Sequence, residues 1–236
     1  MQSHLGRKRK RAILHLYDSH HLRNPLLTET GKAQCQELQE KFPFLRDVEV
    51  ILASPLRRTI QTAAFVFAPE LKERQIPVVL VPNAQEISRL TCDLGYDADV
   101  TKAEAPSLIG DAAPSWNSTN LDMTLVDGDL HPHLECVKRR AAEMRNWIYN
   151  RSEKHIALVT HGGFLHYFTE DWTGCEKAQG TGYLNCEYRK LEFTEDSTGK
   201  EAHLRESGSM LEKQSRPAGL DAHVIHEIEE VERASE

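Results

Sequence analysis

Short, nearly continuous apolar runs recur along the chain, and each is followed by polar residues and then by a helical pattern. These runs span residues 12–17, 48–53, 77–81 and 156–160, and the first is interrupted by His15. Runs of this length without polar alternation are typical of strands that are buried on both faces. They predict a mainly parallel sheet.

Helical patterns lie between the apolar runs. We expect helices at 29–41 after Thr28, at 59–67 after a Ser-Pro pair, and at 134–151. The last has apolar residues on one face, at Val137, Ala141, Met144, Trp147 and Ile148. Strands that alternate with helices predict a three-layer, doubly wound α/β fold.

Composition divides the chain into segments. Residues 1–11 end in five successive basic residues and predict a solvated tail, whereas 12–194 form one domain. Within it, 87–130 is rich in Asp, Ser, Asn, Pro and Gly and predicts an irregular insertion over a pocket. Residues 195–236 are polar and predict a disordered tail, with a terminal amphipathic helix as the alternative.

Charge limits the class of partner. Lys and Arg total 29 against 36 Asp and Glu, so the formal charge is -7. This balance argues against nucleic acid or an anionic membrane as the partner. A small phosphorylated metabolite needs only a local cationic pocket and remains compatible. The apolar run after the basic tail is too short for a signal peptide or a membrane span.

Cysteine and histidine spacing predicts the compartment and the cofactors. Five scattered cysteines form no C-x-x-C pair, which favours a reducing, cytoplasmic location. The basic run leaves nuclear import as an alternative. Twelve histidines show no metal-ligand spacing. We therefore expect no metal and no organic cofactor.

Three polar loops follow the expected strands, at the sheet edge where ligands bind in open α/β folds. Arg58 stands at a helix start, where a guanidinium can hold phosphate oxygens. His161 precedes Gly162, and glycine lets a ligand approach the backbone. Glu86 is a candidate proton donor or base. Taken singly, Arg58 is better explained as a solvated arginine and Glu86 as a surface carboxylate, whereas a core histidine fits His161 equally well.

Together the surrounding motifs resemble the histidine phosphatase superfamily, in its phosphoglycerate-mutase-like, fungal phosphatase-like branch. The matching stretches are SPLRRTIQTA (54–63), PNAQE (82–86) and ALVTHGGFLHYFTEDW (157–172). The resemblance covers 12–194 and implies the phosphoglycerate-mutase fold. It also implies that Arg58 and His161, with Gly162, bind phosphate and that Glu86 is the catalytic acid.

The end of the first expected strand departs from the family pattern. The resemblance implies an Arg-His pair there, whose histidine attacks phosphorus and becomes phosphohistidine. Asp18 and Ser19 hold these two places instead. The change removes one cation and the nucleophile, and a carboxylate in the pocket repels phosphate.

Three explanations of this departure remain open. His20 or His21 is a relocated nucleophile, with Arg23 as the replacement cation, although an exposed histidine pair in a loop fits slightly better. Alternatively, the chain is a non-catalytic relative, or the N-terminal sequence reflects a divergent or mis-spliced gene. The sequence thus predicts a phosphatase that acts on a small-molecule phosphomonoester. The alternatives are a pseudophosphatase that binds a phosphorylated ligand and a non-phosphoryl acid–base enzyme that uses Glu86 and His161.

Overall fold

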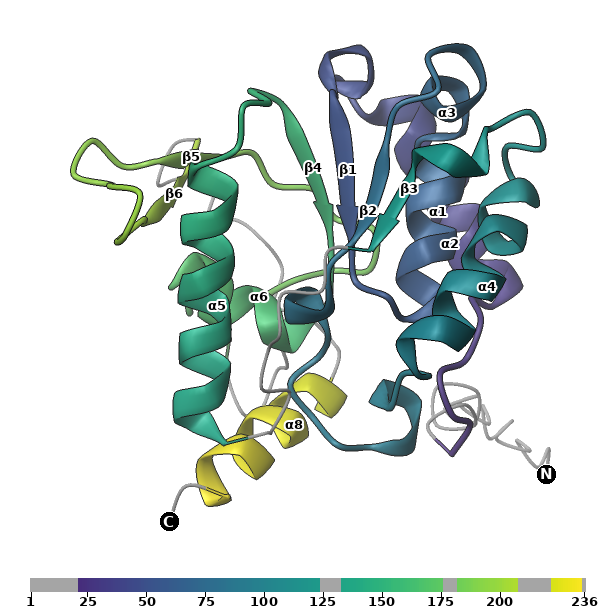
Figure 1. Ribbon diagram of the computed structural model, residues 1–236. Helices are drawn as coiled ribbons and strands as arrows, with labels where there is room; N and C mark the ends of the chain where they lie inside the picture. Colours follow the sequence, from purple (N-terminus) through teal and green to yellow (C-terminus); the bar gives the residue numbers. More distant parts are fainter. Residues whose placement is uncertain (1–20, 124–132, 176–181, 208–221, 235–236) are drawn as a thin grey trace, which may run out of the picture.

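The computed structural model describes residues 21–123, 133–175, 182–207 and 222–234 (Figure 1). Its centre is a sheet in the order β3-β2-β1-β4, in which all neighbours are parallel. The strands are β1 (Val50–Ala53), β2 (Val78–Leu80), β3 (Leu121–Met123) and β4 (Ile156–Val159). Three of the four predicted strands are therefore confirmed, and the one expected at 12–17 lies outside the described residues.

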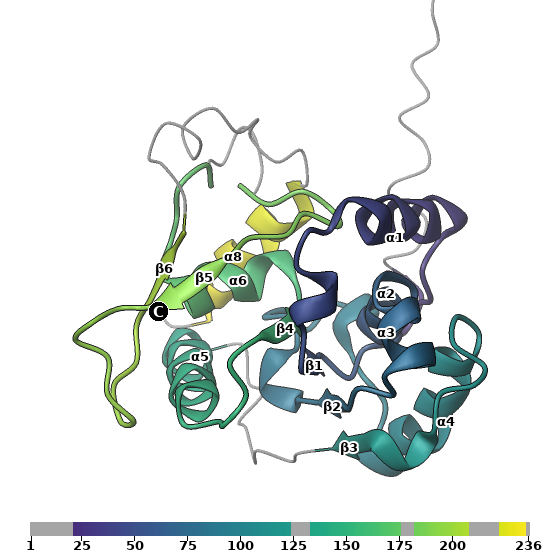
Figure 2. The same ribbon diagram turned by 90° about the horizontal axis from the view of Figure 1, so that it is seen from above.

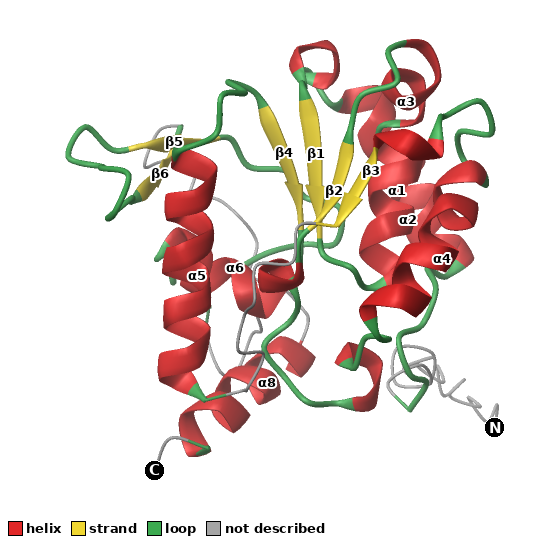
Figure 3. Cartoon of the chain, viewed as in Figure 1, coloured by secondary structure: helices red, strands yellow, loops and turns green. Residues whose placement is uncertain are grey.

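Helices cover both faces of this sheet, so the predicted three-layer α/β architecture is confirmed (Figures 1 and 3). One layer contains α1 (Glu29–Lys41), α2 (Arg57–Val66), α3 (Ala68–Glu73) and α4 (Ala98–Gly110). The opposite layer contains α5 (Leu134–Tyr149), α6 (Gly162–Thr169) and α8 (Ala222–Arg233). The view from above separates the two layers (Figure 2).

The side chains of β1 point alternately to the two faces of the sheet, and each face is covered by one layer of helices. Ile51 and Ala53 are fully buried in the apolar cluster beneath α1, α2 and α4, whereas Val50 and Leu52 are fully buried in the cluster beneath α5, α6 and α8. Successive side chains of a strand point to opposite faces of the sheet. A continuous apolar run is what a strand covered on both faces requires.

The segment at 87–130 differs from the irregular insertion that we predicted. It contains α4, which packs on α2, and the edge strand β3. The buried residues of α4 are Thr101, Ala105, Leu108 and Ile109, which recur at helical spacing. The polar Thr101 and the internal Pro106 obscure this period in the sequence.

The segment at 195–236 is also more ordered, in its described part, than the predicted tail. β6 (Leu204–Glu206) lies in this segment and pairs antiparallel with β5 (Leu191–Phe193), which precedes it. The last helix, α8, is amphipathic and buries Val224, Ile228 and Val231 in the cluster that contains Phe164. The described part of the chain contains no helix that is both long and apolar enough to cross a membrane.

Candidate active site

The structure brings three of the predicted site residues to one edge of the sheet, beyond the carboxyl ends of the strands. Arg58 lies in the first turn of α2, after β1. Glu86 follows the short 3-10 helix η2 (Pro82–Ala84), after β2. His161 directly precedes α6, after β4. Glu86 and His161 are buried, and the Arg58 side chain is 24% exposed. This edge is where open α/β sheets bind ligands.

Arg58 and His161 are in direct contact. Arg58 Nη2 lies 3.1 Å from His161 Nδ1, and His161 Nε2 lies 2.8 Å from Ser54 Oγ. Because a guanidinium only donates, Nδ1 accepts, and the ring proton is on Nε2, which donates to Ser54. Burial, and then the charges of Arg58 and Arg140, hold the His161 pKa well below its usual value. His161 is therefore a neutral imidazole beside a cation.

A second loop fixes the other side of the Arg58 guanidinium. Arg58 Nη1 donates to the Cys92 carbonyl at 2.9 Å, and Nη2 donates to Asp93 Oδ1 at 2.7 Å. Both partners lie in the 3-10 helix η3 (Thr91–Asp93), and the hydroxyl of Ser88 donates to Asp93 Oδ2 at 2.5 Å. Asp93 is buried and was not predicted. The part of the insertion that follows Glu86 therefore forms one wall of the site.

The Glu86 carboxylate lies at the N-terminus of α6. Its oxygens accept from the backbone amides of Ile87, Gly163 and Phe164 at 3.0, 3.2 and 2.9 Å. The first amides of a helix lack partners within the helix and favour an anion. Glu86 therefore connects the loop after β2 to the helix that follows His161.

Opposing influences act on the pKa of Glu86. Burial raises it, and the charge of Asp93 raises it further, whereas Arg58 and the amide hydrogen bonds lower it. The result is a Glu86 pKa of about 7. A carboxylic acid with this pKa is partly protonated at neutral pH, which suits a proton donor.

Gly163 allows the close approach of Glu86 to α6. A Cβ at this position would lie 2.7 Å from Glu86 Oε1 and 2.9 Å from Ile87 Cδ1. We expect Gly163→Ala to lower the free energy of unfolding by about 1–3 kcal/mol, because it forces these groups apart. Gly110→Ala is the matched control, since its Cβ meets nothing within 4 Å. Urea unfolding of both variants tests this, and equal stability of the two would contradict it.

Arg140 supports the loop that carries Glu86. This arginine of α5 is 2% exposed and donates to the carbonyls of Asn83, Gln85 and Glu86 at 3.0, 2.6 and 3.3 Å. Burial lowers its pKa to about 10, so it remains charged at neutral pH. Arg140 was not among the predicted site residues. Its place between Val137 and Ala141, on the apolar face of the helix, does indicate a buried arginine.

A third carboxyl reaches the site from α8. Glu227 is 1% exposed and shares a hydrogen bond with Asp93. Burial, followed by the charges of Glu86 and Asp93, holds the Glu227 pKa well above its usual value. We did not predict Glu227, although it lies between Val224 and Val231, on the apolar side of the helix.

The remaining predicted residues lie elsewhere or outside the described part. Gly162 is the first residue of α6 and is half-buried. Arg23 is exposed, donates to the carbonyls of Leu94 and Gly95 at 3.4 and 2.6 Å, and stacks on a tyrosine ring. Arg23 therefore contacts the insertion. His21 is exposed, whereas His20 lies outside the described residues.

Within the described ranges, no three His, Cys, Asp or Glu side chains are grouped so that they could hold a metal ion. The acidic side chains of the site instead contact Arg58, Ser88 and backbone amides.

A neutral histidine, an arginine beside it and a carboxyl of raised pKa thus meet at the carboxyl edge of a parallel sheet. The model of the histidine phosphatase superfamily (branch 1) matches residues 19–204. The chain belongs to this superfamily, and the predicted resemblance is confirmed.

Curated relatives carry related names. The chain is 27% identical over 209 residues to phosphoglycerate mutase-like protein 1 of Arabidopsis thaliana, covering 77% of this chain and 74% of that protein. It is 34% identical over 155 residues to a probable phosphatase of Schizosaccharomyces pombe, covering 63% and 68%. A mycobacterial glucosyl-3-phosphoglycerate phosphatase structure matches with a TM-score of 0.44 and 16% identity, covering 80% of this chain and 91% of that one.

Proposed function

We propose that the protein is a phosphatase that hydrolyses a small-molecule phosphomonoester in the Arg58–His161–Glu86 pocket. The observation that carries the proposal is the contact of Arg58 with His161 in a member of this superfamily. Arg58 and the Nε2–H of His161 would hold the phosphoryl oxygens. When the ligand binds, the Nε2–H would donate to it instead of to Ser54.

The proposed reaction has two steps. A histidine nitrogen attacks phosphorus as the bond to the leaving oxygen breaks, and Glu86 gives its proton to that oxygen. Water then attacks the phosphohistidine, the N–P bond breaks, and the Glu86 carboxylate takes the proton of the water. The nucleophile of this scheme remains the prediction made from the sequence, His20 or His21.

One observation favours a second candidate, a pseudophosphatase that binds a phosphorylated ligand without turnover. Arg58 already forms an ion pair with Asp93 at 2.7 Å, and two further carboxyls, Glu86 and Glu227, lie nearby. Carboxylates around the phosphate site raise the energy of a bound dianion. This second candidate retains Arg58 as an anion ligand and requires no nucleophile.

Two measurements separate the candidates. Hydrolysis of an aryl phosphate is assayed with the wild type, His161→Ala and His20→Ala/His21→Ala, and binding of inorganic phosphate is measured by calorimetry. For a phosphatase, we expect turnover by the wild type, a large loss in both variants, and phosphohistidine in the trapped protein. A pseudophosphatase would bind phosphate without turnover.

Arg58→Gln tests the anion site itself. We expect it to weaken phosphate binding at least about tenfold, since a charge-assisted contact to phosphate is lost. Arg57→Gln is the matched control, because the neighbouring arginine pairs with Glu104 at 2.5 Å and stacks on Tyr96. Equal binding by the two variants would contradict the assignment of Arg58.

A further inference from the structure

The carboxyl group of Glu227 is held beside the candidate site by the packing of α8. The helix buries Val224, Ile228 and Val231 against the same cluster as Phe164 and Tyr167. Withdrawal of α8 would expose this apolar surface to water, which is unfavourable. Glu227 is therefore a lasting neighbour of Asp93 and Arg58, supplied by a helix far along the chain from them.

The described groups that face Glu227 are mostly acidic. Glu86 from the loop after β2 and Asp93 from η3 act on it as like charges, whereas Arg58 from α2 is the opposing cation. Beyond these, His161 is neutral, and the Arg140 guanidinium is directed to backbone carbonyls.

The hydrogen bond between Glu227 and Asp93 requires a proton between two carboxyl groups. Asp93 already accepts from Arg58 at 2.7 Å and from Ser88 at 2.5 Å. Because both Asp93 oxygens already accept hydrogen bonds, the proton of this pair belongs to Glu227, which donates to Asp93. Two carboxyl groups this close share a proton, because they cannot both be ionised without strong repulsion.

We propose that Glu227 is a specificity-determining residue of this pocket: when it is protonated and bound to Asp93, the pocket admits a phosphate group, and when it is ionised, the pocket excludes one. The proposal rests on the proposed function, because it concerns the ligand of the same site. Ionised Glu227 would add a second negative charge beside Arg58, so that the carboxylates outweigh the cation that binds phosphate.

The test is the pH dependence of phosphate affinity in Glu227→Gln relative to wild type. Glutamine imitates the protonated acid and cannot ionise. Inorganic phosphate binding is measured by calorimetry from about pH 5.5 to about pH 8.5, which brackets the second ionisation of a phosphate group. The ionisation of phosphate affects both affinities equally, so the ratio of the two affinities removes its effect. We expect a ratio near one at low pH that rises to at least about tenfold at high pH.

Two further variants secure the interpretation. Glu232→Gln removes an equal charge from an exposed position of α8 and should follow the wild type at every pH. Glu227→Met tests the same site with an uncharged side chain of similar length that suits the apolar surroundings. It should show the same gain at high pH, and thermal unfolding establishes that each variant is folded.

The outcomes separate this inference from the proposed function. If the curves of Glu227→Gln and Glu227→Met run parallel to the wild type, while Arg58→Gln still abolishes binding, the role of Glu227 is wrong and the anion site stands. If no form binds phosphate at any pH, the proposed function fails and this inference fails with it.

Discussion

Arg140→Met is expected to lower the free energy of unfolding by about 3 kcal/mol or more, because three buried carbonyls lose their donor. Arg140 binds Asn83, Gln85 and Glu86 through their backbone oxygens, and methionine has no donor to replace it. We also expect phosphate binding to weaken, since the loop that positions Glu86 loses its support. Urea unfolding and calorimetry measure the two effects.

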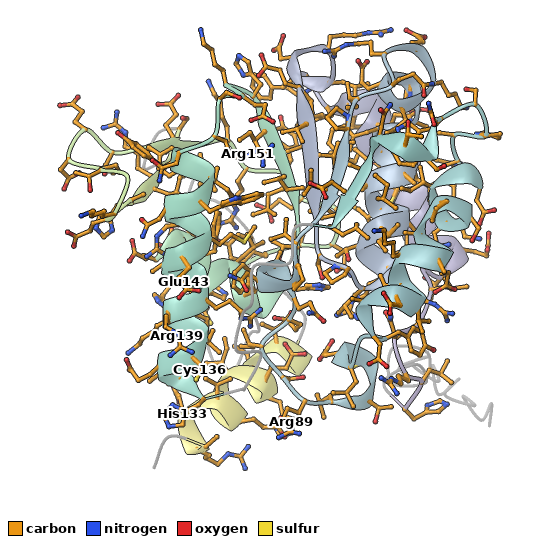
Figure 4. The ribbon with its side chains drawn as sticks, in the orientation of Figure 1. Arg89, His133, Cys136, Arg139, Glu143 and Arg151 are labelled. Carbon is orange, nitrogen blue, oxygen red and sulfur yellow. The ribbon has the colours of Figure 1, made fainter. Side chains whose placement is uncertain are left out.

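The neighbouring arginine provides the control for this substitution. Arg139 projects from α5 toward Glu143, at an N–O distance of 3.8 Å, and its side chain is 55% exposed (Figure 4). Arg139→Met should change stability by no more than about 0.5 kcal/mol, as exposed ion pairs contribute little. A loss of equal size in both variants would show that the hydrogen bonds of Arg140 do not stabilise the loop.

Glu86→Gln is expected to lower turnover by about 100-fold to 10,000-fold, because an amide cannot donate the proton that the leaving oxygen needs. The acid acts in its protonated form, and its pKa is about 7. Turnover of the wild type should therefore fall as pH rises through about 7, and this limb should be absent in the variant. A pH–rate profile of kcat/KM for both proteins measures it.

The raised pKa of Glu86 should also make the free energy of unfolding depend on pH. Its pKa is raised by folding, so the folded state retains a proton that the unfolded state releases. The stabilisation it gives is complete below the unfolded pKa of about 4.5 and is lost as pH rises toward about 7. The difference in unfolding free energy between wild type and Glu86→Gln should follow this course. Glu143→Gln, an exposed change on α5, should show neither effect.

The parts of the fold that the sequence predicts are those with a repeating local signal. The strands at 48–53, 77–81 and 156–160 are apolar along their whole length because helices cover both of their faces. Arg58, Glu86 and His161 each follow one of these strands, and parallel strands bring such positions to one edge. Their meeting was therefore predictable, whereas the tautomer of His161 depends on contacts with Arg58 and Ser54.

The residues that the sequence did not predict act through partners far away in the chain. Asp93 reaches Arg58 from a loop without periodicity, and Arg140 reaches the carbonyls of the loop after β2 from the middle of α5. Nothing local distinguishes Asp93 from an ordinary surface charge. Arg140 and Glu227 do interrupt the apolar faces of their helices, and a buried charge on such a face usually has a distant partner.

The position of Glu227 has a consequence for the order in which the pocket is completed during protein synthesis. Translation produces the chain from its N-terminal side, and α8 follows every other described element. While the chain is still attached to the ribosome, the sheet and Arg58 can form before Glu227 has emerged. Until α8 is made, Asp93 therefore lacks the carboxyl with which it shares a hydrogen bond, so the acidic side of the site is completed after its cation.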